Sequence, residues 1–218
     1  MTGVLLDLDG TLVLSEKVHR ETWQRFFASW GIEVSQQEYQ RTFMGRRARD
    51  VLTHVPGPWS GTDLEVGLRA LAEDAQAMAH TVEIVPGAVE LFTTLRRADR
   101  PIAVVTSAGT DWADEVLNKL LGVRELISVV VTAEDIVHGK PSPEGYLRAC
   151  EQLGLAPSAC AGVEDSPSGV QALVDAGVGD VVGIDTTSSA AELRAAGAHR
   201  TVTDLRLDAG LRALNSAR

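Results

Sequence analysis

The sequence predicts an α/β fold in which a doubly wound parallel sheet carries a small helical cap domain, inserted after the first strand. After residue 81, short continuous apolar runs alternate with segments of helical periodicity. This pattern is typical of a parallel sheet covered by helices on both faces. Residues 15–80 instead show helical periodicity and no convincing strand. We therefore expect a core domain of residues 1–14 and 81–218 and a cap domain of residues 15–80.

The core elements follow from their apolar runs. The first strand is expected at residues 3–8. Further strands are expected at 101–106, 126–132, 159–164 and 181–184. Helices are expected at about 87–98, 110–121, 143–153 and 167–176. The sheet should therefore contain at least five parallel strands.

The cap elements are predicted to be helices. The first runs from about 15 to 30, because aromatic residues recur there at helical spacing. These residues are Trp23, Phe26, Phe27 and Trp30. The stretches SQQE (35–38) and TDLE (62–65) each fit a capping box, so two more helices should begin there. The stretch PGPWSG (56–61) indicates a turn or loop between helices.

Composition and charge disfavour several classes of function. The chain has 218 residues, of which 44% are hydrophobic and 23% are charged, as is ordinary for a globular protein. Its net charge of −10, without a basic cluster, argues against nucleic acid and anionic membrane as partners. It shows neither an apolar run of ~18 residues nor a signal-peptide pattern. Cys150 and Cys160 are interpreted as free thiols in a reducing compartment. We expect a cytoplasmic monomer or small homo-oligomer.

Polar side chains follow the predicted strands at the points where the strands end. Open α/β sheets bind ligands at this edge. Several carboxylates in one crevice require a hard cation, and Mg²⁺ prefers such oxygen ligands. A lysine and hydroxyl groups beside them would suit a phosphoryl group. The side chains concerned are Asp7, Asp9, Thr106, Ser107, Lys140, Glu164 and Asp165.

Four motifs occur along the chain in the order DLDGT, VVTSAG, GKPSPEGY and GVEDSPSG. In order and spacing they resemble the four motifs of the haloacid dehalogenase-like superfamily, and the resemblance covers essentially the whole chain. It implies a Rossmann-like core with a helical cap of the C1 type. Within the superfamily, the chain is similar to sugar- and polyol-phosphate phosphatases and to β-phosphoglucomutase.

The resemblance implies roles for the motif residues. Asp7 would be the nucleophile that forms an aspartyl-phosphate. Asp9 would protonate the leaving alcohol and then activate water. Thr106 would hydrogen-bond the phosphoryl oxygens, and Lys140 would hold both Asp7 and the phosphoryl group. Asp165 would anchor Mg²⁺ together with Asp7 and the backbone carbonyl of Asp9.

Two motif residues keep alternative roles. Ser107 binds the phosphoryl group through its hydroxyl or contributes only its backbone N–H. Glu164 would either bind Mg²⁺ directly or hold the residues that bind it. A calcium loop at DLDGT does not fit, because its fifth and twelfth positions hold Thr11 and Val18, where such a loop needs acids.

The cap contains the candidate residues for substrate selection. His19 falls where β-phosphoglucomutase-like caps carry a histidine near the substrate. Arg46, Arg47 and Arg49 of GRRARD either meet the leaving group or lie on a solvated helix face. They could also form the second phosphate site of a mutase, although Ala48 occupies the position where the mutase-like cap has its arginine.

The leading prediction is therefore a Mg²⁺-dependent phosphatase for a small phosphorylated sugar, polyol or related metabolite. A phosphomutase that uses the same aspartyl-phosphate is the alternative. A non-catalytic regulator is disfavoured, because such proteins usually lose an acid or the lysine and this chain has them all.

Overall fold

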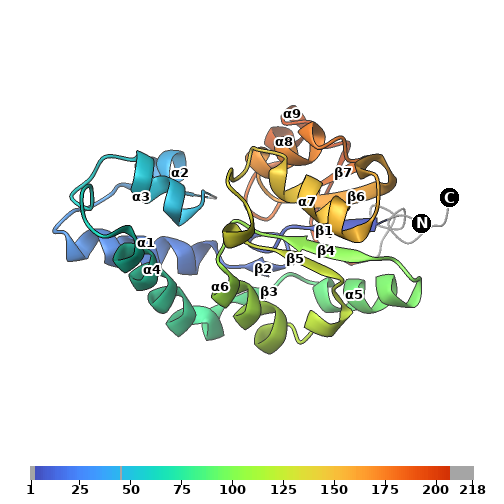
Figure 1. Ribbon diagram of the computed structural model, residues 1–218, viewed down its shortest axis with the longest axis horizontal. Coiled ribbons are helices and arrows are strands. Elements are labelled where there is room, and N and C mark those ends of the chain that lie inside the picture. Colours follow the sequence, from blue (N-terminus) through green and yellow to red (C-terminus); the bar gives the residue numbers. More distant parts are fainter. Residues whose placement is uncertain (1–2, 45, 207–218) are drawn as a thin grey trace.

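The computed structural model of the protein describes residues 3–44 and 46–206. A sheet with helices on both faces forms one part of the molecule, and a group of helices extends from it on one side (Figure 1). Residues 1–2 and 207–218 of the expected core, and Gly45 of the GRRARD motif, lie outside the described residues.

The main sheet, within the described residues, has six parallel strands in the order β5-β4-β1-β6-β7-β8. Leu6, the last residue of β1, pairs with Val104 of β4 on one side and Val163 of β6 on the other. The residues that follow β1 are therefore flanked by the ends of β4 and β6. The strands are β1 (Gly3–Leu6), β4 (Ile102–Val105), β5 (Val129–Val131), β6 (Cys160–Glu164), β7 (Asp180–Ile184) and β8 (Arg200–Val202).

Helices cover both faces of this sheet, so the predicted doubly wound α/β class is confirmed (Figure 1). One face carries α5 (Ala88–Arg97) and α6 (Thr110–Asp114), which continues as a π-helical segment (Glu115–Leu120). The other face carries α7 (Glu144–Leu153), α8 (Pro167–Asp175) and α9 (Ala190–Ala195). Along β1, Val4 and Leu6 pack on the first face and Leu5 on the second. Burial on both faces explains why the strands read as continuous apolar runs.

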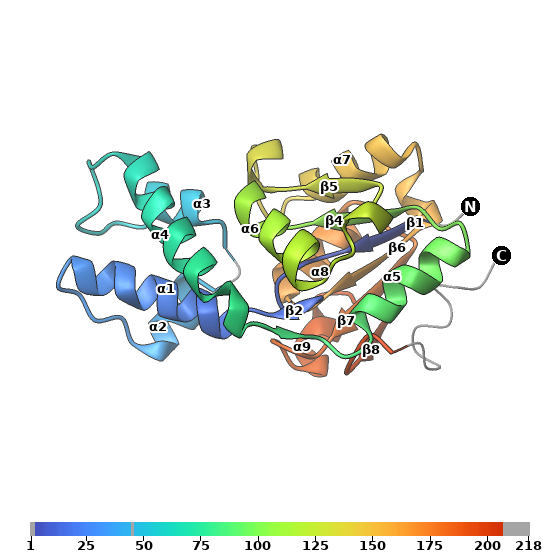
Figure 2. The ribbon, with the colours of Figure 1, turned by 90° about the horizontal axis from the view of Figure 1, so that it is seen from below.

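The cap helices are α1 (Glu16–Ser29), α2 (Gln36–Thr42), α3 (Ala48–His54) and α4 (Leu64–Met78). Helices α1 and α4 lie side by side, and α2 and α3 pack beside them (Figure 2). The predicted first helix is confirmed, with Trp23 stacked on Phe27 at a ring distance of 5.5 Å. The cap has its own apolar cluster, formed by Trp23, Phe26, Phe27, Tyr39, Phe43, Val51, Leu52, Trp59 and Leu71.

The two helix starts predicted in the cap are confirmed, but the capping at TDLE differs from the prediction. The start at SQQE is confirmed, because the Ser35 hydroxyl accepts a hydrogen bond from the Glu38 N–H at 3.2 Å. The start at TDLE is confirmed as well, since α4 begins at Leu64, but the predicted capping box with Thr62 does not form. Asp63 caps α4 by accepting from the Glu65 N–H at 3.0 Å, while the Thr62 hydroxyl donates to a backbone carbonyl. The carboxylate of Asp63 is the better acceptor at the positive end of a helix.

Several short elements were not predicted. Helix α3 lies in an arginine-rich stretch with few apolar residues, and α9 and β8 complete the far edge of the sheet. Strands β2 (Val13–Leu14) and β3 (Glu83–Ile84) form a two-stranded antiparallel ribbon where the chain enters and leaves the cap. Short 3₁₀ turns lie at Ala79–Thr81, Arg124–Leu126, Ala133–Asp135 and Pro157–Ala159. No helix in the described part of the chain is long and apolar enough to cross a membrane.

Candidate active site

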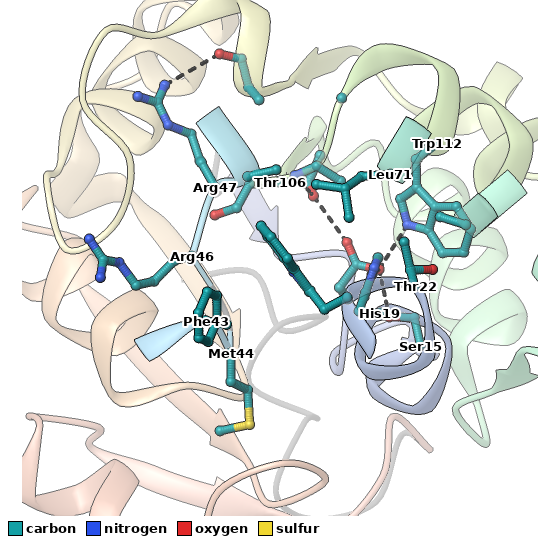
Figure 3. Close-up of a pocket in the computed structure, with 18 of the residues that line it drawn as sticks. Ser15, His19, Thr22, Phe43, Met44, Arg46, Arg47, Leu71, Thr106 and Trp112 are labelled. Carbon is teal, nitrogen blue, oxygen red and sulfur yellow. Dashed lines mark hydrogen bonds and ion pairs between the residues drawn. The ribbon is translucent and has the colours of Figure 1, made fainter. Parts of the chain in front are cut away.

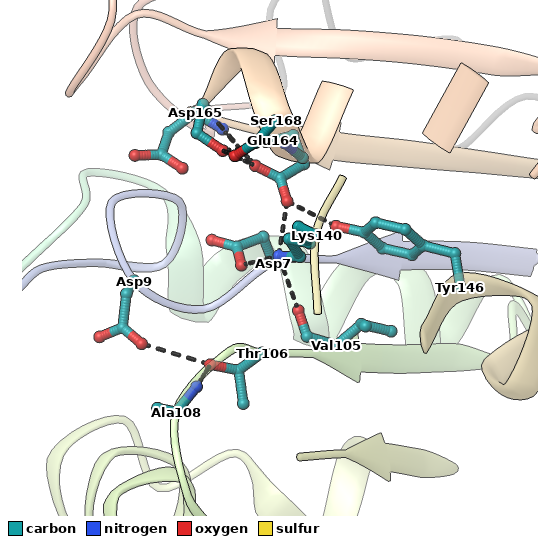
Figure 4. A network of polar contacts seen from close by, with 12 residues as sticks. Asp7, Asp9, Val105, Thr106, Ala108, Lys140, Tyr146, Glu164, Asp165 and Ser168 are labelled. Carbon is teal, nitrogen blue, oxygen red and sulfur yellow. Dashed lines mark hydrogen bonds and ion pairs between the residues drawn. The ribbon is translucent and has the colours of Figure 1, made fainter. Parts of the chain in front are cut away.

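The ends of three adjacent strands bring the predicted polar residues together. Asp7 follows β1, Thr106 follows β4, and Glu164 ends β6 (Figure 4). Lys140 reaches the same point from the loop after β5, and Asp165 follows Glu164. The strand order β4-β1-β6 therefore brings side chains from four segments that are distant in sequence together in one polar site.

Lys140 lies between two buried carboxylates. Its Nζ is 2.5 Å from Oδ1 of Asp7 and 2.6 Å from Oε1 of Glu164, and it also donates to the carbonyl of Val105 at 3.3 Å. Burial lowers the pKa of Lys140, but the charges of Asp7 and Glu164 outweigh this and hold the pKa well above its usual value. Lys140 is therefore a fixed cation beside Asp7.

Both oxygens of Glu164 are already engaged. Oε1 accepts from the Tyr146 hydroxyl at 2.7 Å as well as contacting Lys140. Oε2 accepts from the backbone N–H groups of Asp165 and Ser166 at 3.1 and 3.3 Å, and from the Ser166 hydroxyl at 3.1 Å. Of the two roles left open for Glu164, these contacts favour support of Lys140 and of the loop over direct metal binding.

The acid cluster suits a divalent cation. One ligand atom each from Asp7, Glu164 and Asp165 lies within 4.8 Å of the others. Burial, opposed by Lys140, raises the pKa of Asp7 to about 7. Burial and then the charges of Asp7 and Glu164 hold the pKa of Asp165 well above its usual range.

Two further observations agree with a cation at this cluster. Oδ2 of Asp7 is buried and has no hydrogen-bond partner among the described residues. Gly10 keeps the approach to Asp165 open, because a Cβ at position 10 would overlap Oδ2 of Asp165. The cluster is buried and offers only carboxylate oxygens as ligands, so it fits the ligand preference of Mg²⁺.

Asp9 is held by four side chains. Its Oδ1 accepts from the Ser15 hydroxyl at 2.6 Å and the Trp112 indole N–H at 2.8 Å, and lies 2.9 Å from Nε2 of His19. Its Oδ2 accepts from the Thr106 hydroxyl at 3.3 Å. Burial raises the pKa of Asp9, but the charge of His19 and these donors lower it below the usual value. His19, predicted to lie near the substrate, contacts Asp9 and lines the cavity, and its contact with a substrate stays a prediction.

The sequence interpretation missed Ser15 and Trp112. Ser15 precedes α1 and reads as a helix cap, yet its side chain makes no capping bond and points to Asp9 instead. Trp112 reads as an apolar residue of α6, and no sequence signal places its N–H on a carboxylate.

Thr106 and Ser107 differ in their contacts. Thr106 is almost fully buried, and its hydroxyl accepts from the Ala108 N–H at 3.0 Å while donating to Asp9. Ser107 lies on the wall of the pocket and is partly exposed. The two alternatives for Ser107 stay open.

The three cap arginines have different environments, and Figure 3 shows two of them, Arg46 and Arg47. Arg46 is exposed and donates to the carbonyl of Thr42 at 3.3 Å. Arg49 is exposed and pairs with Glu65 at 2.8 Å. Arg47 is 5% exposed, and its guanidinium is bound to Asp50 and to backbone carbonyls of the core. The Arg47 guanidinium is therefore engaged within the protein, and its contact with a leaving group stays a prediction.

A cavity of about 1380 Å³ lies between the cap and the end of the sheet. Its floor holds Asp7, Asp9, Asp165 and Lys140, and its cap wall carries basic, acidic and aromatic side chains. The aromatic part of the cap wall is formed by Trp23, Tyr39 and Phe43, and Trp112 of α6 adds an aromatic ring from the core. A phosphoryl group could reach Asp7 there while the rest of the molecule faces the cap.

Comparison with known proteins agrees with this geometry. Residues 1–177 match the family model of the haloacid dehalogenase-like hydrolases. Among named proteins, the chain is 38% identical to validoxylamine A 7'-phosphate phosphatase of Streptomyces hygroscopicus subsp. limoneus, with 87% of this chain and 88% of that protein covered. It is 34% identical to hexitol phosphatase A of Escherichia coli (strain K12), over 80% and 79% of the two chains. It is 30% identical to β-phosphoglucomutase of Mycobacterium bovis, over 92% and 88%.

Solved structures show the same fold. The crystal structure of a CbbY mutant from Rhodobacter sphaeroides in complex with xylulose-(1,5)bisphosphate has a TM-score of 0.83 to this chain at 24% identity. The superposition covers 98% of this chain and 99% of that one. At this identity, the likeness describes the fold alone.

Proposed function

The chain belongs to the haloacid dehalogenase-like hydrolases, and from this membership we propose that it is a Mg²⁺-dependent phosphatase for a small sugar or polyol phosphate, acting through an aspartyl-phosphate. The named phosphatases among its relatives support the substrate class. The observation that carries the proposal is the environment of Asp7. This buried carboxylate has one oxygen on Lys140 and the other without a hydrogen-bond partner among the described residues.

In the first step, a carboxylate oxygen of Asp7 attacks phosphorus, and the bond from phosphorus to the substrate alcohol breaks. Asp9 gives its proton to the departing alkoxide oxygen, so that the alcohol leaves neutral. The Lys140 cation, 2.5 Å from Asp7, attracts the phosphoryl oxygens and keeps the nucleophile oriented.

In the second step, Asp9 takes a proton from water as the water oxygen attacks phosphorus. The bond between phosphorus and the Asp7 oxygen breaks, which releases inorganic phosphate and restores the carboxylate. The ionised form of Asp9 fits the hydrogen-bond donors of Ser15 and Trp112. Thr106 orients the other Asp9 oxygen.

Asp7, Asp165 and the backbone carbonyl of Asp9 are the groups that would hold Mg²⁺. When bound, the ion supplies positive charge that offsets the repulsion between the carboxylates and the phosphoryl group. Glu164 then serves the site through Lys140.

A phosphomutase is the alternative activity, and the cap contacts disfavour it. A mutase must hold a second phosphate in the cap while its bisphosphate intermediate turns around. Arg47 is bound to Asp50 and to the core, Arg49 is paired with Glu65, and the mutase-like position is Ala48. Arg46 is the one residue of the proposed second site whose charge has no carboxylate partner at salt-bridge distance in the described structure.

A phosphate-release screen over sugar and polyol phosphates with Mg²⁺ tests the proposal. The wild-type protein should release phosphate from at least one of them, and Asp7→Asn, an isosteric change, should release none. Appreciable turnover by Asp7→Asn would exclude the covalent mechanism. Interconversion of a sugar 1-phosphate and 6-phosphate without net phosphate release would instead identify a mutase.

A further inference from the structure

Arg47 is the most deeply buried arginine of the cap, at 5% exposure, and its hydrogen bonds cross to the core. A guanidinium has five N–H groups. Nε and Nη2 donate to the two oxygens of Asp50 at 2.8 and 2.7 Å. Nη2 also donates to the carbonyl of Val137 at 2.7 Å, and Nη1 donates to the carbonyls of Ile136 and Ala133 at 2.9 and 3.4 Å. All five donors are therefore used within the protein, although Arg47 also lines the cavity.

Two of the three carbonyls that Arg47 binds, those of Ile136 and Val137, belong to peptide groups whose N–H is also hydrogen-bonded. The Glu144 carboxylate, at the start of α7, accepts from the N–H groups of Val137 and His138 at 2.7 and 2.9 Å. The peptide groups Ile136–Val137 and Val137–His138 each have Arg47 at the oxygen and Glu144 at the N–H. The Arg47 cation thus lies at the negative, carbonyl end of each peptide dipole, and the Glu144 carboxylate lies at the positive, N–H end. Hydrogen bonds to charged groups are stronger than those between neutral groups.

This loop leads directly to Lys140. Arg47 and Glu144 together form a clamp on the peptide groups Ile136–Val137 and Val137–His138. Gly139 is the only residue between this clamp and Lys140, and the Arg47 side chain passes over it. A Cβ at position 139 would stand 2.9 Å from Nε and 3.0 Å from Cδ of Arg47. The absence of a side chain at Gly139 thus allows Arg47 to lie against the backbone. In Figure 3 the Arg47 side chain extends away from the group around His19, toward a core segment.

We propose that Arg47 is a positioning residue, which fixes the loop before Lys140 when the cap lies against the core, and so sets the position of the Lys140 cation beside Asp7. Glu144 belongs to the core and holds its side of the loop in any position of the cap. Arg47 comes from the cap, so its half of the clamp forms only when the cap is in place. This inference rests on the proposed phosphatase function and assigns to Arg47 no contact with substrate.

The kinetic test uses Arg47→Gln and Gly139→Ala, with Arg25→Gln as the matched control. Arg25 is a cap arginine that pairs with a carboxylate, Glu21, but is half-exposed and lies outside the cavity. Arg47→Gln should lower kcat by about 10- to 100-fold, the cost of a misplaced catalytic group, with KM changed less than about twofold. The loss should be equal for aryl, sugar and polyol phosphates. Gly139→Ala should act in the same direction, and Arg25→Gln should match the wild type.

Hydrogen exchange provides a readout that does not depend on activity. In Arg47→Gln, the amides of Val137 and His138 should exchange faster, while the amides of α1 and α4 keep their wild-type rates. A purely structural role of Arg47 would instead accelerate exchange throughout the cap.

The results separate this inference from the proposed function. Unchanged exchange at Val137 and His138, or a kcat of Arg47→Gln equal to that of Arg25→Gln, overturns the role of Arg47. A changed ranking of substrates overturns it as well, because Arg47 would then contact the leaving group. If the wild-type protein hydrolyses no phosphate monoester, the proposed function fails, and the exchange experiment still decides whether Arg47 holds the loop.

Discussion

Trp112→Phe is expected to weaken both the stability and the activity of the protein, because it removes one donor from Asp9. The indole N–H of Trp112 lies 2.8 Å from Oδ1 of Asp9 and Trp112 is 7% exposed. A hydrogen bond to a charged group contributes about 1.5–3 kcal/mol, compared with about 0.5–1.5 kcal/mol for one between neutral groups. The chain offers a matched control in Trp59, which is also 7% exposed and donates to the neutral carbonyl of Val55 at 3.0 Å. Trp59→Phe loses the same ring volume.

The free energy of unfolding should therefore fall by about 1–2 kcal/mol more in Trp112→Phe than in Trp59→Phe, as measured by urea denaturation at neutral pH. Because the pKa of Asp9 is lowered in the folded protein, its contribution is present above the ordinary carboxylate pKa and is lost as the pH falls through the folded value. The difference between the two variants should accordingly shrink in acid.

Activity provides the second comparison. Trp112→Phe should lower kcat by about tenfold, because the base that takes a proton from water is held less firmly. Trp59→Phe should retain the wild-type kcat, since Trp59 lies in the apolar cluster of the cap. Equal losses of stability in the two variants, together with an unchanged kcat in Trp112→Phe, would refute the role assigned to Trp112.

Other expected outcomes follow from the same site. Asp9→Asn should reduce turnover more for alkyl phosphates than for activated aryl phosphates, because acidic alcohols need less protonation; an equal loss on both contradicts the acid role. Activity should disappear with a chelator and return with Mg²⁺ but poorly with Ca²⁺, and full activity without divalent metal contradicts the metal site. Without a bound metal, the pKa of Asp7 is raised to about 7. The contribution of Asp7 to the free energy of unfolding should therefore decline as the pH rises from about 4 through 7. Urea denaturation in chelator at several pH values should show this decline in the wild type and not in Asp7→Asn. Replacement of His19, Arg46 or Arg49 by Ala should change the ranking of kcat/KM among substrates. A lost charged hydrogen bond to a substrate should lower kcat/KM for that substrate by ~10–150-fold. If all three variants keep the wild-type ranking, other residues select the substrate.

The sequence alone was enough to predict the sheet and the floor of the site. Apolar runs such as VLL before Asp7 and AVV before Thr106 indicate strands buried on both faces, because only such strands lack polar alternation. The carboxyl ends of parallel strands lie at one edge, so the acids, Thr106 and Lys140 could be placed together from the sequence. The short strand β8 could not be predicted in this way, since its sequence RTV offers no apolar run.

The partners of these residues were decided by the tertiary structure. Trp112 reaches Asp9 because long-range packing within the core sets the position of α6, and Arg47 reaches the carbonyls of Ile136 and Val137 because α3 packs against the core. Local sequence shows only that Trp112 is apolar and Arg47 is charged. Whether an indole N–H meets a carboxylate, or a guanidinium meets backbone rather than substrate, depends on how the elements pack in space, which spacing along the chain does not encode.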